Sequence, residues 1–279
     1  MESIVKAVSL ITRMIPATLI VVLFLGCAKQ ETNQAPELSA SQREAAISSA
    51  MELLQTDQVP EALAITSTLI AKDPMNAESQ EVYALALIAR GWKLQERRDA
   101  QGAQKAWDEA LTAYMNACNY SSNPGLLELS TGQLAQMLQN DELAIVYYKN
   151  AHLNNKKDAR AAFYLSQIYL LNKDWVSAKN WLTQSLLRTP NEPFALLSLA
   201  LAEAELSNCE TALRLAIDGC EILPSDPNIR FVQARVVRLC GNSQHAHEIL
   251  LSLPIQFQQT ALFQEELENC KLSMSSEDK

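Results

Sequence analysis

The segment SQIYLLNKDWVSA (166–178) is followed at a constant interval by ALAEAELSNCETA (200–212) and then by ARVVRLCGNSQHA (234–246). Each segment begins with a small residue and ends, twelve positions on, with alanine. The pair occurs six times in the chain. The small residues are Ala50, Gly91, Gly132, Ser166, Ala200 and Ala234, and the alanines are Ala62, Ala103, Ala144, Ala178, Ala212 and Ala246. The first two steps between alanines are the longer ones, and the last three are identical. A fixed period of this length indicates a repeat protein.

The spacing predicts pairs of antiparallel helices. A small residue midway along the first helix and an alanine early in the second let the two helices approach to about 8 to 10 Å. The alanine is usually followed four positions on by a large residue, and a proline often ends the unit. These residues are Trp107, Tyr148, Leu182 and Leu250, and Pro74, Pro190 and Pro224. The two longer steps hold seven additional residues each, which predicts lengthened helices between Ala77 and Arg97 and near Ala117.

The composition favours an all-α chain and argues against a nucleic-acid partner. Glycine is scarce, with 7 in 279 residues, and β-branched residues seldom alternate with polar ones. The net charge is −9, and basic residues cluster only from Lys156 to Arg160 and at Arg97 and Arg98. The sequence therefore offers no continuous basic track for phosphates.

The repeat resembles the tetratricopeptide repeat (TPR), whose unit is about 34 residues long, the length of the three identical steps. The resemblance covers roughly Ser41 to Phe257 and implies a right-handed α-solenoid of about six helix hairpins, residues 42–258. We expect a capping helix at 259–272, with Glu265, Glu266 and Glu268 on a solvated outer face, and a disordered tail at 273–279. An irregular α-solenoid of another repeat class is the alternative, against which the three identical steps argue.

The N-terminus has the layout of an exported protein. Lys6 and Arg13 precede an uncharged apolar run from Met14 to Leu25, which is shorter than the roughly 20 residues of a membrane span. We therefore predict a signal peptide at residues 1–26. The alternative at this end is an uncleaved anchor.

Residues Leu23 to Cys27 resemble the lipobox of bacterial lipoproteins, which implies that Cys27 is acylated and becomes the mature N-terminus. A signal peptide without lipid is the other possibility. Residues 27–41 are then the lipidated cysteine and a flexible polar tether. Ala28 stands where an inner-membrane retention signal has aspartate, so a lipid-anchored protein of the cell envelope facing the periplasm, on the outer membrane rather than the inner, is expected.

No catalytic or cofactor site can be recognised in the sequence. His245 and His247 are two apart on a predicted helix and point about 200° from each other, so they cannot hold one metal ion. There is no phosphate-binding glycine loop, no GxSxG and no CxxC. We predict no enzymatic activity, no cofactor, no metal and no small-molecule substrate.

Two of the cysteines are candidates for a disulfide. Cys209 falls at the predicted turn of the fifth hairpin, and Cys240 falls near the same end of the first helix of the sixth hairpin. The two cysteines could therefore approach each other. The alternative is that these cysteines are small buried hydrophobic residues.

The resemblance to the tetratricopeptide repeat implies that the first helix of each unit lines a concave groove and that this groove is a site for a protein or peptide partner. Counting along the helices places these residues in the groove: Leu126, Leu129, Gln133 and Gln136; Arg160, Phe163, Gln167 and Leu170; Phe194, Leu197 and Leu201; and Phe231, Arg235 and Arg238. Such a groove suits an extended or helical peptide with apolar anchors and some acidity. The alternative interpretation of the phenylalanines is that they form the core between repeats.

Two functions remain after these exclusions. One is a membrane-anchored protein–protein interaction scaffold or assembly adaptor for an envelope complex such as a pilus or secretion machine. Its architecture resembles the pilotin-type lipoproteins that help place the type IV pilus secretin. The other is a self-associating structural lipoprotein of the envelope, whose groove is filled by its own tail or by another copy.

Overall fold

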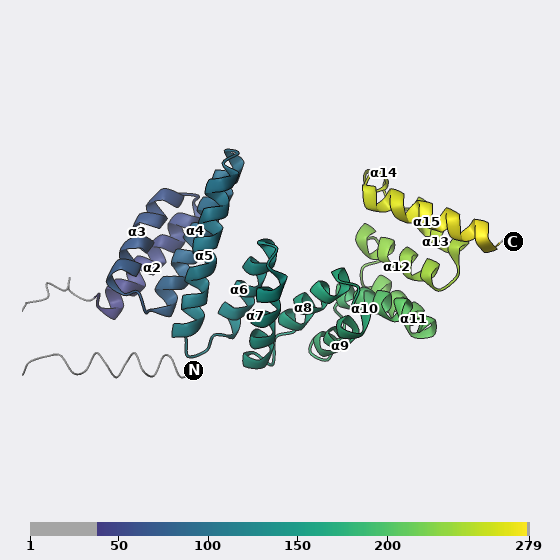
Figure 1. Ribbon diagram of the computed structural model, residues 1–279, viewed down its shortest axis with the longest axis horizontal. Helices are drawn as coiled ribbons and strands as arrows, with labels where there is room; N and C mark the ends of the chain where they lie inside the picture. Colours follow the sequence, from purple (N-terminus) through teal and green to yellow (C-terminus); the bar gives the residue numbers. More distant parts are fainter. Residues whose placement is uncertain (1–37, 278–279) are drawn as a thin grey trace, which may run out of the picture. The chain divides into compact units, whose positions relative to one another are not determined.

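The computed structural model describes residues 38–277, in which every regular element is an α-helix. Fourteen helices follow one another as six hairpins and two C-terminal helices (Figure 1). The expected all-α hairpin array is thereby confirmed. None of the helices in this part of the chain is both long enough and apolar enough to cross a membrane. The predicted signal peptide, Cys27 and tether residues 28–37 lie outside the described residues.

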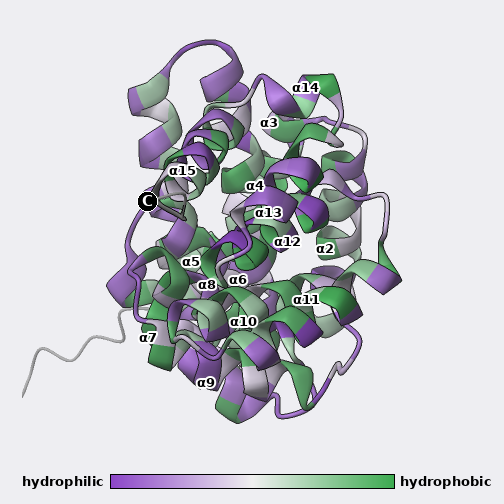
Figure 2. Cartoon of the chain, turned by 90° about the vertical axis from the view of Figure 1, so that its right-hand side faces the viewer, coloured by the Kyte–Doolittle hydropathy of each residue, from purple (hydrophilic) through white to green (hydrophobic). Residues whose placement is uncertain are grey.

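Each hairpin, numbered 1 to 6 along the chain, pairs a first helix with a second. The first helices are α2 (Ala40–Gln55), α4 (Ala77–Glu96), α6 (Gly125–Met137), α8 (Arg160–Leu171), α10 (Pro193–Glu205) and α12 (Pro227–Leu239). The second helices are α3 (Val59–Lys72), α5 (Ala100–Tyr120), α7 (Asp141–Asn154), α9 (Trp175–Leu186), α11 (Cys209–Ile222) and α13 (Ser243–Leu251). They are followed by α14 (Ile255–Gln258) and α15 (Ala261–Glu277). Figure 2 shows hydrophobic and hydrophilic residues interleaved along these helices, as expected where each helix buries one side.

All six hairpins turn through the same backbone conformation. After the C-cap of the first helix comes a residue with φ between 57° and 85°, and the N–H of the following residue bonds back to the carbonyl five positions earlier. In hairpin 2 this bond joins Asp99 to Leu94 at 2.9 Å. The positive-φ residues are Asp57, Arg98, Gln139, Lys173, Ser207 and Gly241, which are spaced by the same steps as the alanines of the repeat. The turn is a Schellman motif, so the repeat is present in the backbone as well as in the sequence.

The twelve small residues of the repeat all lie in the protein interior. A Cβ atom added to Gly132 would come within 2.6 Å of the Tyr148 ring, and one added to Gly91 would clash with the Trp107 ring. In these two hairpins the large residue four positions after the alanine thus occupies the space that the glycine leaves free. This contact fixes how the two helices of a hairpin pack.

Hairpin 2 is longer than its neighbours (Figure 1). Its helices α4 and α5 have 20 and 21 residues, whereas the helices of the other hairpins have between 9 and 16. Gly91 stands five residues before the end of α4, as Ala50 does in α2, so the additional turns precede Gly91. The lengthening expected from the two longer steps is confirmed.

The C-terminal cap differs from the expectation in two respects. Helix α15 continues to Glu277, so residues 273–277 are helical where a disordered tail was expected. Glu266, expected on the solvated face, is 4% exposed and lies on the buried side of α15 with Phe263 and Cys270. The spacing of three and four residues places all three on one face, which packs on α12 and α13. Glu265 and Glu268 are exposed as expected.

Candidate functional site

The residues predicted to bind a partner occupy equivalent positions of successive first helices. These positions lie six and three residues before the small residue and one and four residues after it. We call the residues at these four positions the first-helix face. In hairpin 3, for example, they are Leu126, Leu129, Gln133 and Gln136.

Members of the first-helix face differ in how much surface they offer. Leu126 is 57% exposed and Phe194 42% exposed. Leu129 and Leu197, by contrast, are 4% and 2% exposed and belong to the packed interior. The remaining predicted residues are exposed (Gln133 and Arg160) or half-buried (Gln136, Phe163, Gln167, Leu170, Leu201, Phe231, Arg235 and Arg238). Leu129 and Leu197 therefore position the helices and are not available to a ligand.

Two of the three predicted phenylalanines pack mainly against their own chain. The Phe163 ring lies 5.9 Å from the Tyr164 ring, and the Phe231 ring lies 5.6 Å from the Phe257 ring, measured between centroids. Phe163 also contacts the cluster between hairpins 4 and 5 that includes Leu182. Phe194 is thus the most exposed of the three predicted phenylalanines.

The three predicted arginines are each paired with a carboxylate of the same chain. Their ion pairs are Arg160 with Asp158 at 2.6 Å, Arg235 with Glu205 at 3.7 Å and Arg238 with Glu266 at 2.5 Å. The Arg160 guanidinium holds the pKa of the Asp158 carboxyl below its usual value. The expected preference for an acidic partner is therefore not supported at these positions, because their charges are already compensated.

The polar residues of the face make cross-helix contacts. Gln136 Oε1 accepts a hydrogen bond from the Tyr148 hydroxyl at 2.9 Å, and Gln167 Nε2 donates to Ser198 Oγ at 3.3 Å. Burial raises the pKa of Tyr148 well above its usual value, so its hydroxyl remains a donor throughout the physiological range. These bonds fix the orientation of the two amides.

The same face extends into hairpins 1 and 2, which the prediction from the sequence did not include. Met51 and Trp92 directly follow the small residues Ala50 and Gly91, as Gln133 follows Gly132, and they are 36% and 49% exposed. The Trp92 ring packs edge-on against Trp107, with centroids 5.0 Å apart. Beside the face, Met137 and Leu171 are 39% and 74% exposed. The repeat spacing alone would have identified Trp92.

Cys209 and Cys240 are brought together as anticipated, but as free thiols. Cys209 begins α11 and Cys240 caps α12, and the two side chains are hydrogen-bonded. Burial, together with this bond, raises the pKa of the Cys240 thiol to about 12. A thiol with so high a pKa exchanges slowly near neutral pH. Their disulfide stays a prediction.

The three histidines lie on two separate helices, His152 on α7 and the other two on α13. His152 packs edge-on against Trp181, and burial together with the Arg188 charge lowers its pKa. His245 lies 3.7 Å from Glu248 on the same helix. Within residues 38–277, no three His, Cys, Asp or Glu side chains lie close enough to hold a metal ion.

Known structures share the hairpin architecture. Neither a protein-family model nor a curated protein sequence matches the chain. A tetratricopeptide repeat protein from Parabacteroides merdae matches with a TM-score of 0.61 at 17% identity, over 85% of this chain and 88% of that one. PilF of Pseudomonas aeruginosa matches with a TM-score of 0.58 at 17% identity, over 80% and 95%. PilW, described as a widely conserved type IV pilus biogenesis factor, matches with a TM-score of 0.57 at 18% identity, over 82% and 100%.

A further match, to a chain of the APC/C Cut9–Hcn1 assembly, spans only 42% of that chain's length. At these identities the likeness establishes the fold and nothing finer. The fold is a TPR-like α-solenoid, as the repeat spacing predicted.

Proposed function

We propose that this TPR-like solenoid is a protein–protein interaction scaffold whose first-helix face binds a segment of another protein. The observation that carries the proposal is the exposure of large apolar side chains on the first-helix face of three of the six hairpins. Trp92, Leu126 and Phe194 are 49%, 57% and 42% exposed, and they come from hairpins 2, 3 and 5. Apolar and aromatic anchors of this kind contribute most of the binding energy at protein interfaces.

The charge of the face specifies the chemistry of the partner. Because Arg160, Arg235 and Arg238 are paired internally, binding to the face would rest on apolar anchors and on hydrogen bonds to exposed amides such as Gln133. An amphipathic helix or an extended apolar segment suits such a surface. We do not expect strong dependence on ionic strength at this site.

The setting we propose is the bacterial cell envelope, with the chain acting as an assembly adaptor for a pilus or secretion machine. Support comes from the predicted signal peptide, from Cys27 in its lipobox-like segment, and from the fold shared with PilF and PilW. Anchored through Cys27, the array would face the periplasm, with the outer membrane favoured. The solenoid's role is then to hold partner proteins and involves no chemistry of its own.

The double substitution Leu126→Ala and Phe194→Ala tests the face. The two residues are 57% and 42% exposed, so the free energy of unfolding should change by less than about 1 kcal/mol, whereas each truncated anchor should cost binding roughly 1 to 2 kcal/mol. We expect at least a tenfold loss of affinity for a partner captured in host membranes, measured with the full-length tagged chain.

A matched control uses exposed apolar residues on second helices. Val146 and Ile217, both 52% exposed, lie on α7 and α11. The double variant Val146→Ala and Ile217→Ala should keep full affinity. Equal losses from the two double variants, or none from the first, would remove the first-helix face as the binding surface.

A further inference from the structure

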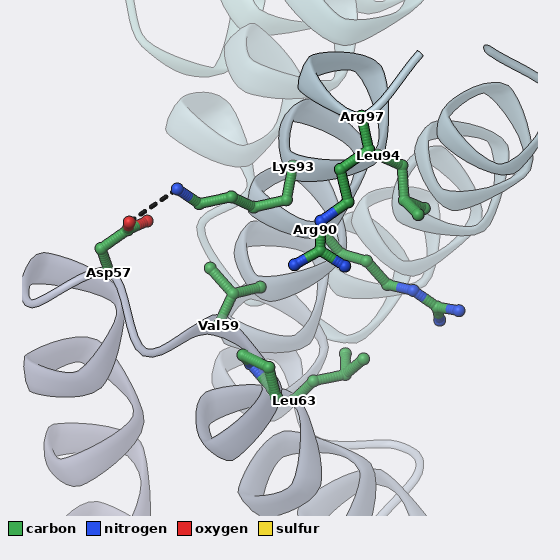
Figure 3. Close-up of a pocket in the computed structure, with 8 residues that line it drawn as sticks. Asp57, Val59, Leu63, Arg90, Lys93, Leu94 and Arg97 are labelled. Atoms are coloured by element: carbon green, nitrogen blue, oxygen red, sulfur yellow. Dashed lines mark hydrogen bonds and ion pairs between the residues drawn. The ribbon is translucent and has the colours of Figure 1, made fainter. Parts of the chain in front are cut away.

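A cavity of about 500 Å³ lies between hairpins 1 and 2, away from the first-helix face. Val59, Pro60 and Leu63 from the start of α3 and Leu94 from α4 form its apolar part. Its cations are Arg90, Lys93 and Arg97, spaced three and four residues apart along α4 (Figure 3). This volume is within the range of small-ligand pockets, about 300 to 1,000 Å³. We call it the α3–α4 pocket.

The charges of the α3–α4 pocket are not balanced. Asp57 is the one carboxylate among the residues that line it, and it pairs with Lys93 at 2.6 Å (Figure 3). Among residues 38–277, Arg90 and Arg97 form no ion pair, and both are exposed. Two guanidinium groups therefore remain uncompensated beside an apolar surface, in a chain whose net charge is −9.

The equivalent place between hairpins 4 and 5 contains an ion pair instead of a pocket with unpaired cations. There Lys179 of α9 bonds to Glu203 of α10 at 3.0 Å, and Glu203 also accepts a hydrogen bond from Asn208 at 2.7 Å. By repeat spacing, Lys179 and Glu203 correspond to Leu63 and Leu94 of the α3–α4 pocket. Both members of that ion pair are thus replaced by leucine in the α3–α4 pocket, and no carboxylate stands at the place of Glu203.

The cations themselves are specific to this pocket. Arg90 immediately precedes the small residue Gly91, and Arg97 follows it by six positions. In the other five hairpins, none of the residues at these two positions is charged: they are Ser49 and Thr56, Thr131 and Leu138, Leu165 and Asn172, Leu199 and Leu206, and Gln233 and Cys240. The pair of arginines is therefore not a by-product of the repeat.

We propose that the α3–α4 pocket binds an acidic segment of a partner protein, in which a carboxylate lies next to an apolar side chain. The carboxylate would bridge Arg90 and Arg97, since a guanidinium group presents two parallel N–H donors to a carboxylate. The apolar neighbour would pack on Val59, Leu63 and Leu94. This second contact extends the proposed scaffold function, on which it rests, and distinguishes a peptide from a free anion.

The test is a titration of the full-length chain in detergent with two fluorescently labelled, blocked hexapeptides. One contains two Leu-Glu pairs, and the other contains Leu-Gln pairs in their place. We expect fluorescence polarisation to show binding of the first peptide, at least tenfold weaker binding of the second, and weakening of the first when salt is raised from about 0.05 to 0.5 M. Equal binding of both peptides, or no binding of the first up to about 1 mM, would overturn the proposal.

Variants locate the binding site. Arg90→Ala with Arg97→Ala should lower affinity for the acidic peptide at least tenfold, whereas Lys149→Ala with Arg214→Ala should not. These control residues are exposed, lie on second helices and form no ion pair within the described residues. Equal losses in both variants would mean that the peptide responds to net charge alone. Inorganic phosphate that displaces the peptide at equal concentration would indicate an anion site, contrary to the proposal.

The first-helix face variant separates this proposal from the broader one. Leu126→Ala with Phe194→Ala should leave hexapeptide binding intact while weakening capture of the membrane partner. If partner capture is unaffected but the hexapeptide still needs Arg90 and Arg97, the face proposal fails and the pocket proposal stands. If the face variant weakens partner capture but the hexapeptide does not need Arg90 and Arg97, the pocket proposal fails and the face proposal stands.

Discussion

Replacing Arg238 with Met is expected to lower the free energy of unfolding by about 3 to 5 kcal/mol. Arg238 pairs with Glu266, and the two side chains are 15% and 5% exposed. Within the described residues, Glu266 forms its ion pair and its hydrogen bonds with Arg238 alone. The substitution would therefore leave a buried carboxylate uncompensated, and because this pair joins α12 to α15, the C-terminal cap should unfold first.

A double variant separates the destabilisation caused by an unpaired Glu266 from the net contribution of the Arg238–Glu266 ion pair to the free energy of unfolding. Replacing Arg238 with Met and Glu266 with Leu together should restore most of the lost stability, because apolar residues can often substitute for a buried pair. Lys93→Met is the exposed control: Lys93 and Asp57 are 36% and 68% exposed, so its loss should cost less than about 1 kcal/mol. Urea unfolding followed by circular dichroism measures all three variants. An unchanged midpoint for Arg238→Met would show that the pair does not hold the cap.

Replacing Cys27 with Ala should abolish acylation completely and leave an uncleaved precursor. Cys27 lies outside the described residues, so this expectation rests on the apolar run from Met14 to Leu25 and on Gly26-Cys27. In the lipoprotein resemblance the Cys27 thiol receives the lipid, and each buried methylene of an acyl chain contributes about 0.8 kcal/mol to membrane binding.

Metabolic labelling with a fatty-acid analogue, followed by gel electrophoresis, measures the effect of the Cys27 substitution. Cys118→Ala is the matched control and should leave labelling and mature size unchanged. Persistent labelling of the Cys27 variant, or a mature form of normal size, would contradict lipid anchoring through this residue.

The sequence was sufficient to predict the hairpins because the decisive contacts lie within one hairpin. Gly132 and Tyr148 touch across the two helices of hairpin 3, and Gly91 and Trp107 touch across hairpin 2 at the same separation along the chain. A contact between residues at a constant separation leaves a constant spacing in the sequence. The lengthened hairpin 2 could be predicted for the same reason, from the seven residues added to each of the first two steps.

Contacts between hairpins and with the cap left no such spacing. Arg238 and Glu266 are 28 residues apart and Lys179 and Glu203 are 24 apart, and neither pair is repeated elsewhere in the described residues. On a helical wheel, Arg238 looks like a surface cation and Glu266 like part of a polar cap. The structure shows both to be packing residues, which a helical periodicity alone does not reveal.

The candidate surfaces were predicted only in part for a related reason. The helical period placed Leu126 and Phe194 at exposed positions, but it could not separate them from Leu197, whose burial depends on the neighbouring helix α11. The α3–α4 pocket needed the structure as well, because it forms where two hairpins meet. Among residues at the same position of successive repeats, the interfaces between repeats determine which side chains remain accessible.

Site-specific photo-crosslinking in host membranes is the most direct test of the claim that first helices bind a partner. A photoreactive phenylalanine would replace Phe194 on α10 in one chain and Val146 on α7 in a second; the native side chains are 42% and 52% exposed. We predict one discrete adduct with another envelope protein from position 194 and none from position 146. Equal adducts from both positions, or adducts with a second copy of this chain alone, would contradict partner binding at the first-helix face.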